Sequence, residues 1–240
     1  MEGSAMNESS QPLFEILRGI TTATITTMLL KKGIRRCWMK GPQPLIAIGA
    51  RLVGPAFTLR FVPVREDLAT PESWAKPTST RGAIEEMPEG CIAVADAMGI
   101  TSAGIFGDIL TVRMKKRNVT ALVTDGVVRD KAGVLASALP VWCAGVAAPA
   151  SVNGLTFVGR QEPIGCGGCA VFPGDIIVCD GDGAVVIPQD LVAFVAEEGA
   201  EHERMESFIV AEVERGAKLP GLYPMNAETR MRYEAWKKNR

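Results

Sequence analysis

Short apolar segments that alternate with helical segments restrict the chain to folds that combine both kinds of structure. Residues 91–96, 120–124 and 140–143 are short and apolar, which is typical of buried strands. Residues 111–117 and 131–138 lie between them and have helical character. This order of strands and helices predicts an α/β fold with a mixed sheet.

Further strands and helices are expected on both sides of this region. The predicted strands are residues 46–62, with a kink near Gly54 and Pro55, and residues 155–158, 169–172, 176–179 and 184–187. Near the N-terminus, residues 13–20 have helical spacing and Gly33 is the expected stop, although the β-branched residues 21–27 disfavour a helix.

The C-terminal region is expected to be helical. Asp190 is predicted to cap a long helix that runs to about Lys218, and a shorter helix is predicted over residues 227–238. The sequence contains no repeat and no linker. We therefore predict one domain over residues 13–218, a disordered N-terminus over residues 1–12 and a helical extension over residues 219–240.

Charge and composition argue against a protein that coats nucleic acid and against a membrane protein. The 240 residues contain 26 Lys and Arg against 27 Asp and Glu, whereas proteins that coat nucleic acid usually have a basic excess. The longest uncharged stretch, residues 132–159, is broken by Pro140, Pro149 and several glycines, so it is interpreted as strands with turns. Six cysteines and the lack of a signal-like run in the first 20 residues favour a reduced, cytoplasmic protein.

The histidine content restricts the chemistry. His202 is the one histidine in the sequence, so a Ser-His-Asp triad and a metal site with several histidine ligands are nearly excluded. Cys166 and Cys169 form a single CxxC pair in a glycine-rich turn, and they are interpreted as turn or core residues rather than as a zinc or redox site.

Two neighbouring segments carry the candidate site. The loop over residues 104–110 places glycines before a helix, whose free N–H groups bind carboxylate or phosphate. Residues 125–130 follow a strand, where ligand sites of α/β proteins gather. There the Asp130 carboxylate suits a hard divalent cation, and the Arg129 guanidinium suits a developing oxyanion. The alternatives are a glycine-permitted turn and a surface ion pair.

A specific pattern links the two segments. Asp108 is followed, after twenty residues, by Arg129 and Asp130, and this spacing resembles that of class II 4-hydroxy-4-methyl-2-oxoglutarate aldolases, a family that also contains the regulator of ribonuclease activity A. The resemblance extends from about Thr22 to Gly216. It includes the motifs at residues 54–58, 140–142, 172–177 and 180–188.

The resemblance implies a fold, an assembly and a reaction. The fold is a three-layer β/β/α swivelling-type domain, assembled as a homotrimer or homohexamer. The reaction is the cleavage of a small 4-hydroxy-2-oxo acid, such as 4-hydroxy-4-methyl-2-oxoglutarate, with release of pyruvate and with oxaloacetate decarboxylation as a side activity. Neither nucleic acid nor a membrane is an expected partner.

The resemblance also implies residue roles. Asp130 would be the direct ligand of Mg²⁺ or Mn²⁺, and Arg129 would contact the keto oxygen and stabilise the enolate. The amides of Gly107, Asp108, Ile109 and Leu110 would bind the substrate carboxylate, and Asp108 would orient a water that carries protons. The residues themselves agree with a metal route, since neither Lys40 nor Lys131 is marked as a Schiff-base lysine.

Two glutamates of the long C-terminal helix are further candidates. Glu203 and Glu206 lie on a stripe that is otherwise apolar, at positions 192, 196, 199, 203, 206, 210 and 213. The resemblance implies that one of them reaches the active site of a neighbouring subunit, and the alternative is that both are solvated. His202 beside them is interpreted as structural.

Two other functions use the same residues differently. One is a non-catalytic protein that binds and regulates a ribonuclease. The other is a dehydratase or decarboxylase of a sugar-derived 2-oxo acid, which would use the same enolate chemistry. Arg129 and Asp130 favour catalysis over regulation, because a pure binding protein has no need for a metal ligand that faces a pocket.

Overall fold

One long strand organises the sheet in the computed structural model, which describes residues 11–239. Strand β2 (Leu52–Pro63) pairs antiparallel with β9 (Ile176–Asp180) as far as Pro55, and from Ala56 it pairs in parallel with β3 (Ile92–Asp96). The change of partner falls where the sequence predicts a kink. Proline suits this position, because it cannot donate a ladder hydrogen bond.

Within residues 11–239, the main sheet contains eight strands and nearly closes into a barrel. Its order is β1 (Gln43–Pro44), β5 (Val141–Cys143), β4 (Ala121–Thr124), β3, β2, β9 and β10 (Gly183–Ile187), with β6 (Leu155–Arg160) also paired to β2. Strands β2 to β5 are parallel to one another, and the β9, β10, β6 and β1 pairings are antiparallel. A bridge between Trp38 and Val185 of β10 brings the two ends of this order together.

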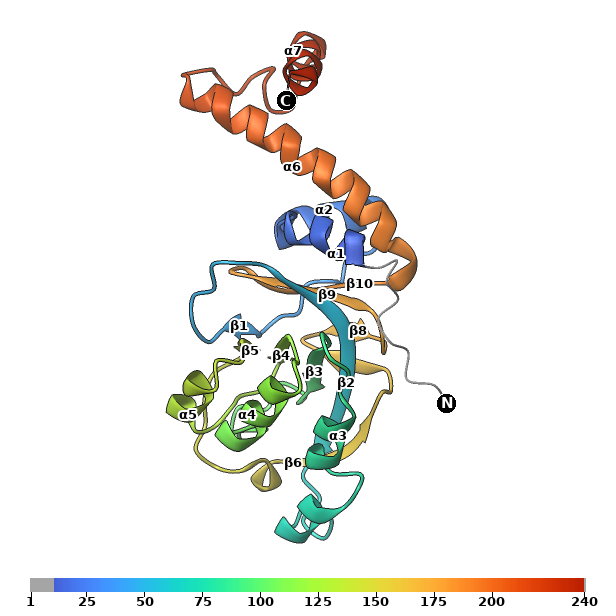
Figure 1. Cartoon of the computed structure of the whole chain (residues 1–240), viewed down its shortest axis with the longest axis vertical. Helices are drawn as coiled ribbons and strands as arrows, with labels where there is room; N and C mark the ends of the chain where they lie inside the picture. The colour runs from blue at the N-terminus through green and yellow to red at the C-terminus, as the bar shows by residue number, and fades with distance from the viewer. Residues whose placement is uncertain (1–10, 240) are drawn as a thin grey trace.

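Alternate residues of the central strands face two different cores. In β3, Ile92 and Val94 pack with β9, β10 and the helices α1 (Gln11–Arg18), α2 (Thr22–Lys31) and α6 (Val192–Glu214). Ala93 and Ala95 pack on the other face, under α3 (Thr80–Glu86), α4 (Asp108–Lys116) and α5 (Lys131–Ala136). This alternation follows from the two-residue period of a strand. Figure 1 shows the resulting layers, and the predicted α/β class with a mixed sheet is confirmed.

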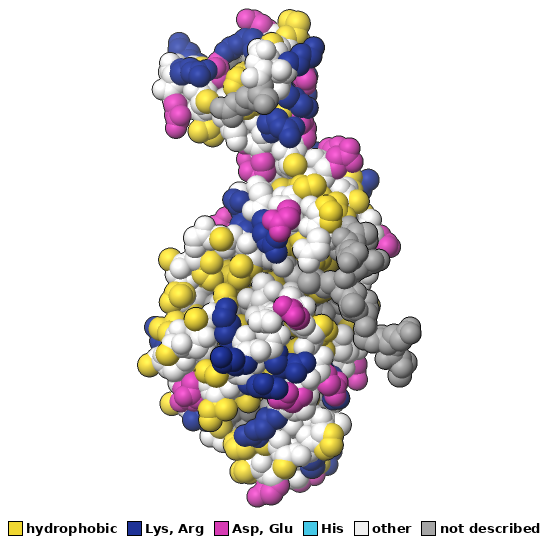
Figure 2. Space-filling view, in the orientation of Figure 1, with side chains coloured by type: hydrophobic (Ala, Val, Ile, Leu, Met, Phe, Trp, Pro, Cys, Tyr) yellow, Lys and Arg dark blue, Asp and Glu magenta, His cyan; other side chains and the backbone are white. Residues whose placement is uncertain are grey.

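The helix α4 ends as predicted in a basic turn beside α3. Its last turn contains Arg113, Lys115 and Lys116, and Lys and Arg side chains gather over this part of the surface in Figure 2. Arg113 pairs with Glu85 of α3, with Nε 2.8 Å and one terminal nitrogen 2.6 Å from the carboxylate oxygens. Cations at this end also favour the helix because they face its negative pole.

The hairpin of β7 (Ile164–Cys166) and β8 (Cys169–Val171) explains the CxxC pair. Cys166 and Cys169 lie opposite each other, on either side of a turn in which Gly167 and Gly168 have positive φ. Both thiols are buried, and burial raises the pKa of Cys169 to about 11. The interpretation as turn and core residues is confirmed.

The N-terminal segment forms two helices rather than one. Gln11 already belongs to α1, whereas residues 1–10 of the predicted disordered segment lie outside the described part of the chain. The β-branched run is helical because Thr21 caps α2 by accepting a hydrogen bond from the Thr24 amide. Within residues 11–239, no single helix has the length and apolarity to cross a bilayer; α1 and α2 pass that test only as a pair bent by 113°.

The C-terminal helices form an arm that stands out from the body (Figures 1 and 2). Asp190 does not cap α6, because it lies in a short 3-10 turn, η4 (Gln189–Leu191), and makes no capping hydrogen bond. The helix α7 (Ala227–Lys238) has the predicted bounds. Phe208 and Tyr233 join these two helices in a small separate core.

The apolar stripe predicted for α6 is correct only in its first half. Val192, Ala196 and Gly199 are buried against the body, but Val210 is 55% exposed. In the second half Phe208 and Ile209 are buried instead. The buried face turns because this half of α6 packs on α7 rather than on the sheet.

The start of α2 is bound to the end of β9. The Asp180 carboxylate, at the end of β9, accepts hydrogen bonds from the Thr22 amide at 2.9 Å and the Thr22 hydroxyl at 2.8 Å. Arg51 lies 3.7 Å from the same carboxylate. A carboxylate at a helix N-terminus satisfies free N–H groups and faces the positive pole of the helix.

We predict that Asp180→Ala lowers the free energy of unfolding by about 2–3 kcal/mol, because the two hydrogen bonds from Thr22 to a charged group are lost together with a third from the Asp182 amide. The melting temperature should fall by about 5–10 °C in a thermal scan. The control is Asp182→Ala, an exposed carboxylate two residues away. Equal melting temperatures for the two variants would contradict the role given to Asp180.

Candidate active site

Two glycines and a left-handed residue bring the two predicted segments into contact. Gly107 begins α4, and a Cβ on it would lie 2.6 Å from Oδ2 of Asp130. Asp130 begins α5 with φ of 53°, a conformation that Asp tolerates better than most residues. Its side chain makes no capping hydrogen bond to α5, so the carboxylate faces Gly107 and Arg129 instead.

Arg129 is held at both its backbone and its side chain. Its amide donates to the Phe106 carbonyl at 2.9 Å, and its Nε donates to Oδ2 of Asp130 at 3.0 Å. A Cβ on Gly104 would lie 2.7 Å from the Arg129 Cβ, so only glycine fits there. The two terminal nitrogens of the guanidinium have no partner among residues 11–239, which leaves them available to an anionic oxygen.

Asp108 is locked between α4 and α5. Its Oδ1 accepts a hydrogen bond from the Ile109 amide at 2.7 Å, and a Cβ on Gly133 would lie 2.5 Å from the Asp108 Cβ. The Ile109 amide is therefore already occupied. The N–H groups of Gly107, Asp108 and Leu110 remain for an anion, since the first turn of a helix has no internal acceptors for them.

The predicted residues thus lie together at one end of the sheet. Gly107 contacts Arg129 and Asp130, which share a hydrogen bond, and the neighbouring Asp108 packs on Gly133 of α5. Ile109 is 78% exposed and Leu110 packs on the core beneath α4. The side chains of Arg129 and Asp130 are 36% and 44% exposed, so a ligand from solvent can reach them.

The donor set suits a hydrated hard cation. Within residues 11–239 no three His, Cys, Asp or Glu side chains gather into a metal cage. A structural zinc site needs four protein ligands, whereas Mg²⁺ is held by one or two carboxylates and keeps several waters. Oδ2 of Asp130 lies against Gly107 and accepts from Arg129, whereas its Oδ1 accepts no hydrogen bond among residues 11–239. The residues present therefore fit Mg²⁺ or Mn²⁺.

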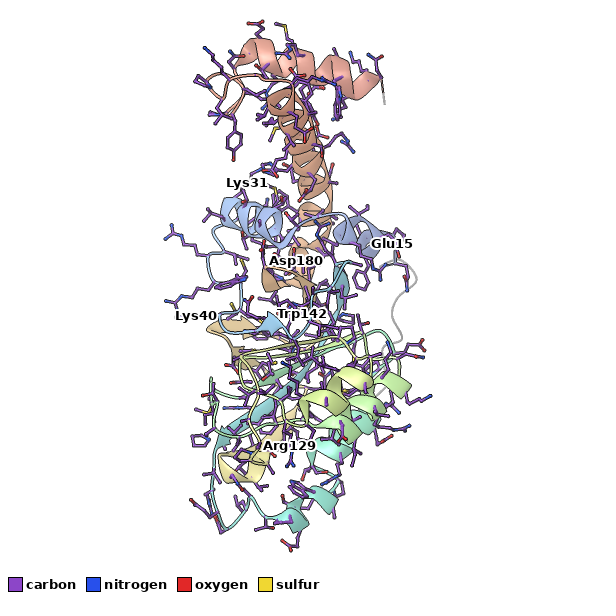
Figure 3. All side chains as sticks on the ribbon, turned by 90° about the vertical axis from the view of Figure 1, so that its left-hand side faces the viewer. Glu15, Lys31, Lys40, Arg129, Trp142 and Asp180 are labelled. Atoms are coloured by element: carbon purple, nitrogen blue, oxygen red, sulfur yellow. The ribbon has the colours of Figure 1, made fainter. Side chains whose placement is uncertain are left out.

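Glu203 and Glu206 are far from this site within one chain. Figure 3 places Arg129 in the part of the body away from the arm, and Glu203 lies where α6 meets α2. Glu203 accepts hydrogen bonds from the Thr21 amide at 2.8 Å and the Thr21 hydroxyl at 2.7 Å. Glu206 lies 3.1 Å from Nε2 of His202, and its side chain is 41% exposed. Glu203 has a structural partner in its own chain, and a role in a neighbouring subunit stays a prediction for both.

Asp125, which was not predicted as a site residue, fixes two loops behind the site. Its Oδ1 accepts from the Ala97 amide at 2.8 Å, and its Oδ2 accepts from the Gly167 amide at 3.1 Å. Burial raises the pKa of the Asp125 carboxyl, and these backbone hydrogen bonds oppose the rise. The sequence signal that could have identified Asp125 was its position between a buried strand and a glycine.

Comparisons with known proteins agree with this fold. The crystal structure of RraAS2 from Streptomyces coelicolor, an unusual member of the RNase ES inhibitor RraA protein family, is similar with a TM-score of 0.75 and 32% sequence identity. The match covers 86% of this chain and 98% of that one. The family model described as RraA-like, Aldolase/RraA, matches residues 22–186. The chain therefore belongs to the RraA-like family.

Two curated relatives share parts of the sequence. "Putative 4-hydroxy-4-methyl-2-oxoglutarate aldolase" from Halalkalibacterium halodurans is 37% identical over 108 residues, which are 45% of this chain and 50% of that protein. Protein DlpA from Legionella pneumophila is 28% identical over 171 residues, which are 71% of this chain and 27% of that protein. The chain thus spans at most half the length of these two relatives.

We predict that Glu203→Gln lowers the stability of the protein relative to wild type, and that this loss is larger at neutral pH than at acid pH. Burial acts to raise the pKa of Glu203, but the hydrogen bonds from Thr21 outweigh it and the pKa is lowered. A lowered folded-state pKa stabilises the fold above the unfolded value of about 4.3, and this contribution is lost as the pH falls through the folded value.

The measurement is the difference in melting temperature between wild type and variant from pH 7 to pH 3. It should be largest at pH 7 and shrink towards pH 3. Glu197→Gln, at an exposed position on the same helix, should show little difference at any pH. A constant difference for Glu203→Gln across the range would contradict the assignment.

Proposed function

We propose that the protein is a divalent-metal-dependent aldolase that cleaves 4-hydroxy-2-oxo acids, such as 4-hydroxy-4-methyl-2-oxoglutarate, and releases pyruvate. One observation carries the proposal: Arg129 and Asp130 share a hydrogen bond beside the free N–H groups that begin α4. Membership of the RraA-like family and the name of the Halalkalibacterium relative support it. Decarboxylation of oxaloacetate is proposed as a side activity, since it gives the same enolate.

The start of α4 would bind the substrate carboxylate. The N–H groups of Gly107, Asp108 and Leu110 lie at the N-terminus of α4, where the helix adds a partial positive charge. The terminal nitrogens of Arg129 would bind the keto oxygen at C2. Together these groups would hold a 2-oxo acid by its carboxylate and by its keto oxygen, which lowers the entropic cost of reaching the transition state.

The reaction breaks the bond between C3 and C4. The C4 hydroxyl loses its proton and becomes a carbonyl, and the electron pair of the broken bond moves towards the C2 oxygen to form an enolate. Arg129 would stabilise this oxyanion, and protonation at C3 then yields pyruvate. A divalent cation at Asp130 would supply Lewis-acid polarisation of the substrate carbonyl. Asp108 would orient the water that carries the proton, because its position is fixed against Gly133.

The relation to RraAS2 favours a second candidate function, the regulation of a ribonuclease by direct binding. The two functions make different demands on Asp130. If the protein inhibits a ribonuclease of the RNase ES type equally well as wild type and as Asp130→Asn, and neither form releases pyruvate with Mg²⁺ present, regulation is the function.

We also propose a homotrimer or homohexamer, in which Glu206 is the glutamate freer to reach a neighbouring subunit.

We predict that Asp130→Asn reduces pyruvate release with Mg²⁺ or Mn²⁺ by at least about 100-fold, because the variant lacks the anionic ligand. Asparagine tolerates the left-handed backbone, and its amide oxygen can still accept from Arg129, so the fold should persist. The assay is pyruvate formation from 4-hydroxy-4-methyl-2-oxoglutarate, with Asp182→Asn as the control. Full activity of Asp130→Asn would overturn the metal assignment.

We predict that Gly107→Ala lowers turnover by about 10- to 100-fold, since its Cβ would displace the Asp130 carboxylate and misplacement of about 1 Å can cost 100-fold. The control is Gly181→Ala, where a Cβ would meet no atom within 4 Å. Turnover and the Mn²⁺ dissociation constant are measured together. Wild-type values of both for Gly107→Ala would show that the contact is not needed.

A further inference from the structure

A pocket at the end of the body farthest from the arm lies outside the candidate active site. It is enclosed by β2, β6 and two short 3-10 turns, η2 (Pro71–Ala75) and η3 (Ser151–Asn153), and its volume is about 180 Å³. In Figure 1, β6 lies below α3 and α4. None of the lining residues belongs to the segments that contain Gly107 or Arg129.

The floor of the pocket is apolar and buried. Phe61 and Phe157 pack edge to face with ring centroids 5.2 Å apart, and Phe61 and Leu155 are almost completely buried. Trp74 forms a wall, and the Arg81 guanidinium lies 4.6 Å from the centre of its indole ring. The aromatic wall is therefore held in place before a ligand arrives, which reduces the cost of binding.

The rim of the pocket is positively charged and rich in hydroxyl groups. Lys76 is the only charged residue in the lining, and no carboxylate lies within 4.0 Å of its Nζ among residues 11–239. Thr80 is 9% exposed, and its hydroxyl has no hydrogen-bond partner within the same residues. By contrast, Ser79 and Thr156 already accept hydrogen bonds from the Gly82 and Arg65 amides. The lining therefore offers one cation and a free hydroxyl, and no anion.

We propose that this pocket binds a small organic monoanion with an apolar body, such as an aromatic or branched aliphatic carboxylate. The carboxylate would pair with Lys76 and accept from Thr80, and the apolar body would pack on Phe61, Phe157 and Trp74. The volume is below the range of about 300–1,000 Å³ that is typical of drug-sized ligands, so a single ring or short branched chain fits. The proposal is independent of the aldolase activity.

The test uses benzoate as the probe and the full chain. Calorimetric titration should give a dissociation constant on the order of 1 mM or below, as expected for so small a ligand. The fluorescence of Trp74 should change in parallel, and Trp74→Phe should remove that change. Benzyl alcohol, which lacks the charge, and acetate, which lacks the apolar body, should each bind at least about threefold more weakly.

Variants locate the site. Lys76→Gln should weaken benzoate binding about three- to tenfold, as expected for one exposed charge-assisted hydrogen bond. Ala69→Phe should abolish binding by filling the pocket, and Lys116→Gln on α4 should leave it unchanged. Circular dichroism and melting curves confirm that each variant is folded.

Each opposite result refutes the proposal. The proposal is wrong if benzoate does not bind at about 10 mM. It is also wrong if Ala69→Phe binds benzoate as tightly as wild type does, or if benzyl alcohol binds to wild type as tightly as benzoate does. Unchanged affinity in Lys76→Gln would remove the anion part of the proposal. Since pyruvate release is not a readout, loss of the aldolase assignment would leave these outcomes unaffected.

Discussion

The candidate site depends on a close approach of two backbone segments that a single methyl group would prevent. Gly104 packs on Arg129, Gly107 on Asp130, and Gly133 on Asp108. These three contacts hold the start of α4 against the start of α5. As a result, a helix N-terminus, a guanidinium and a carboxylate face the same place, although more than twenty residues of sequence separate them.

The order of strands and helices was predictable because it rests on local patterns. Strands β3, β4 and β5 are apolar on both faces, since each lies between two cores, and such runs are easy to recognise. The kink at Pro55 was also predictable, but its reason was not: β2 exchanges one partner for another there. Partner exchange is a property of the whole sheet and leaves only a weak local signal.

The parts that escaped prediction depend on contacts between distant elements. The buried face of α6 changes halfway because α7 packs on its second half, and no periodicity in α6 alone reveals that. Glu203 serves the N-terminus of α2, which is 182 residues earlier in the chain. Asp125 holds the loop after β3 and the turn between β7 and β8 together. In each case the partner of a buried or half-buried carboxylate is set by tertiary structure.

The site residues rest on a long spacing pattern that carried the resemblance, and their roles stay a prediction; the structure brings Gly107 against Arg129 and Asp130, and Gly133 against Asp108. What the fold adds is the physical reason for the spacing: α4 and the following strand return the chain to the same end of the sheet. The same geometry explains why glycine occupies positions 104, 107 and 133.

The most direct test of the central claim is anomalous diffraction from crystals soaked with Mn²⁺ and oxalate. The account predicts a manganese peak within bonding distance of the Asp130 carboxylate, with oxalate between the metal, Arg129 and the first amides of α4. A peak elsewhere, with the Asp130 carboxylate turned away from any bound ion, would contradict it.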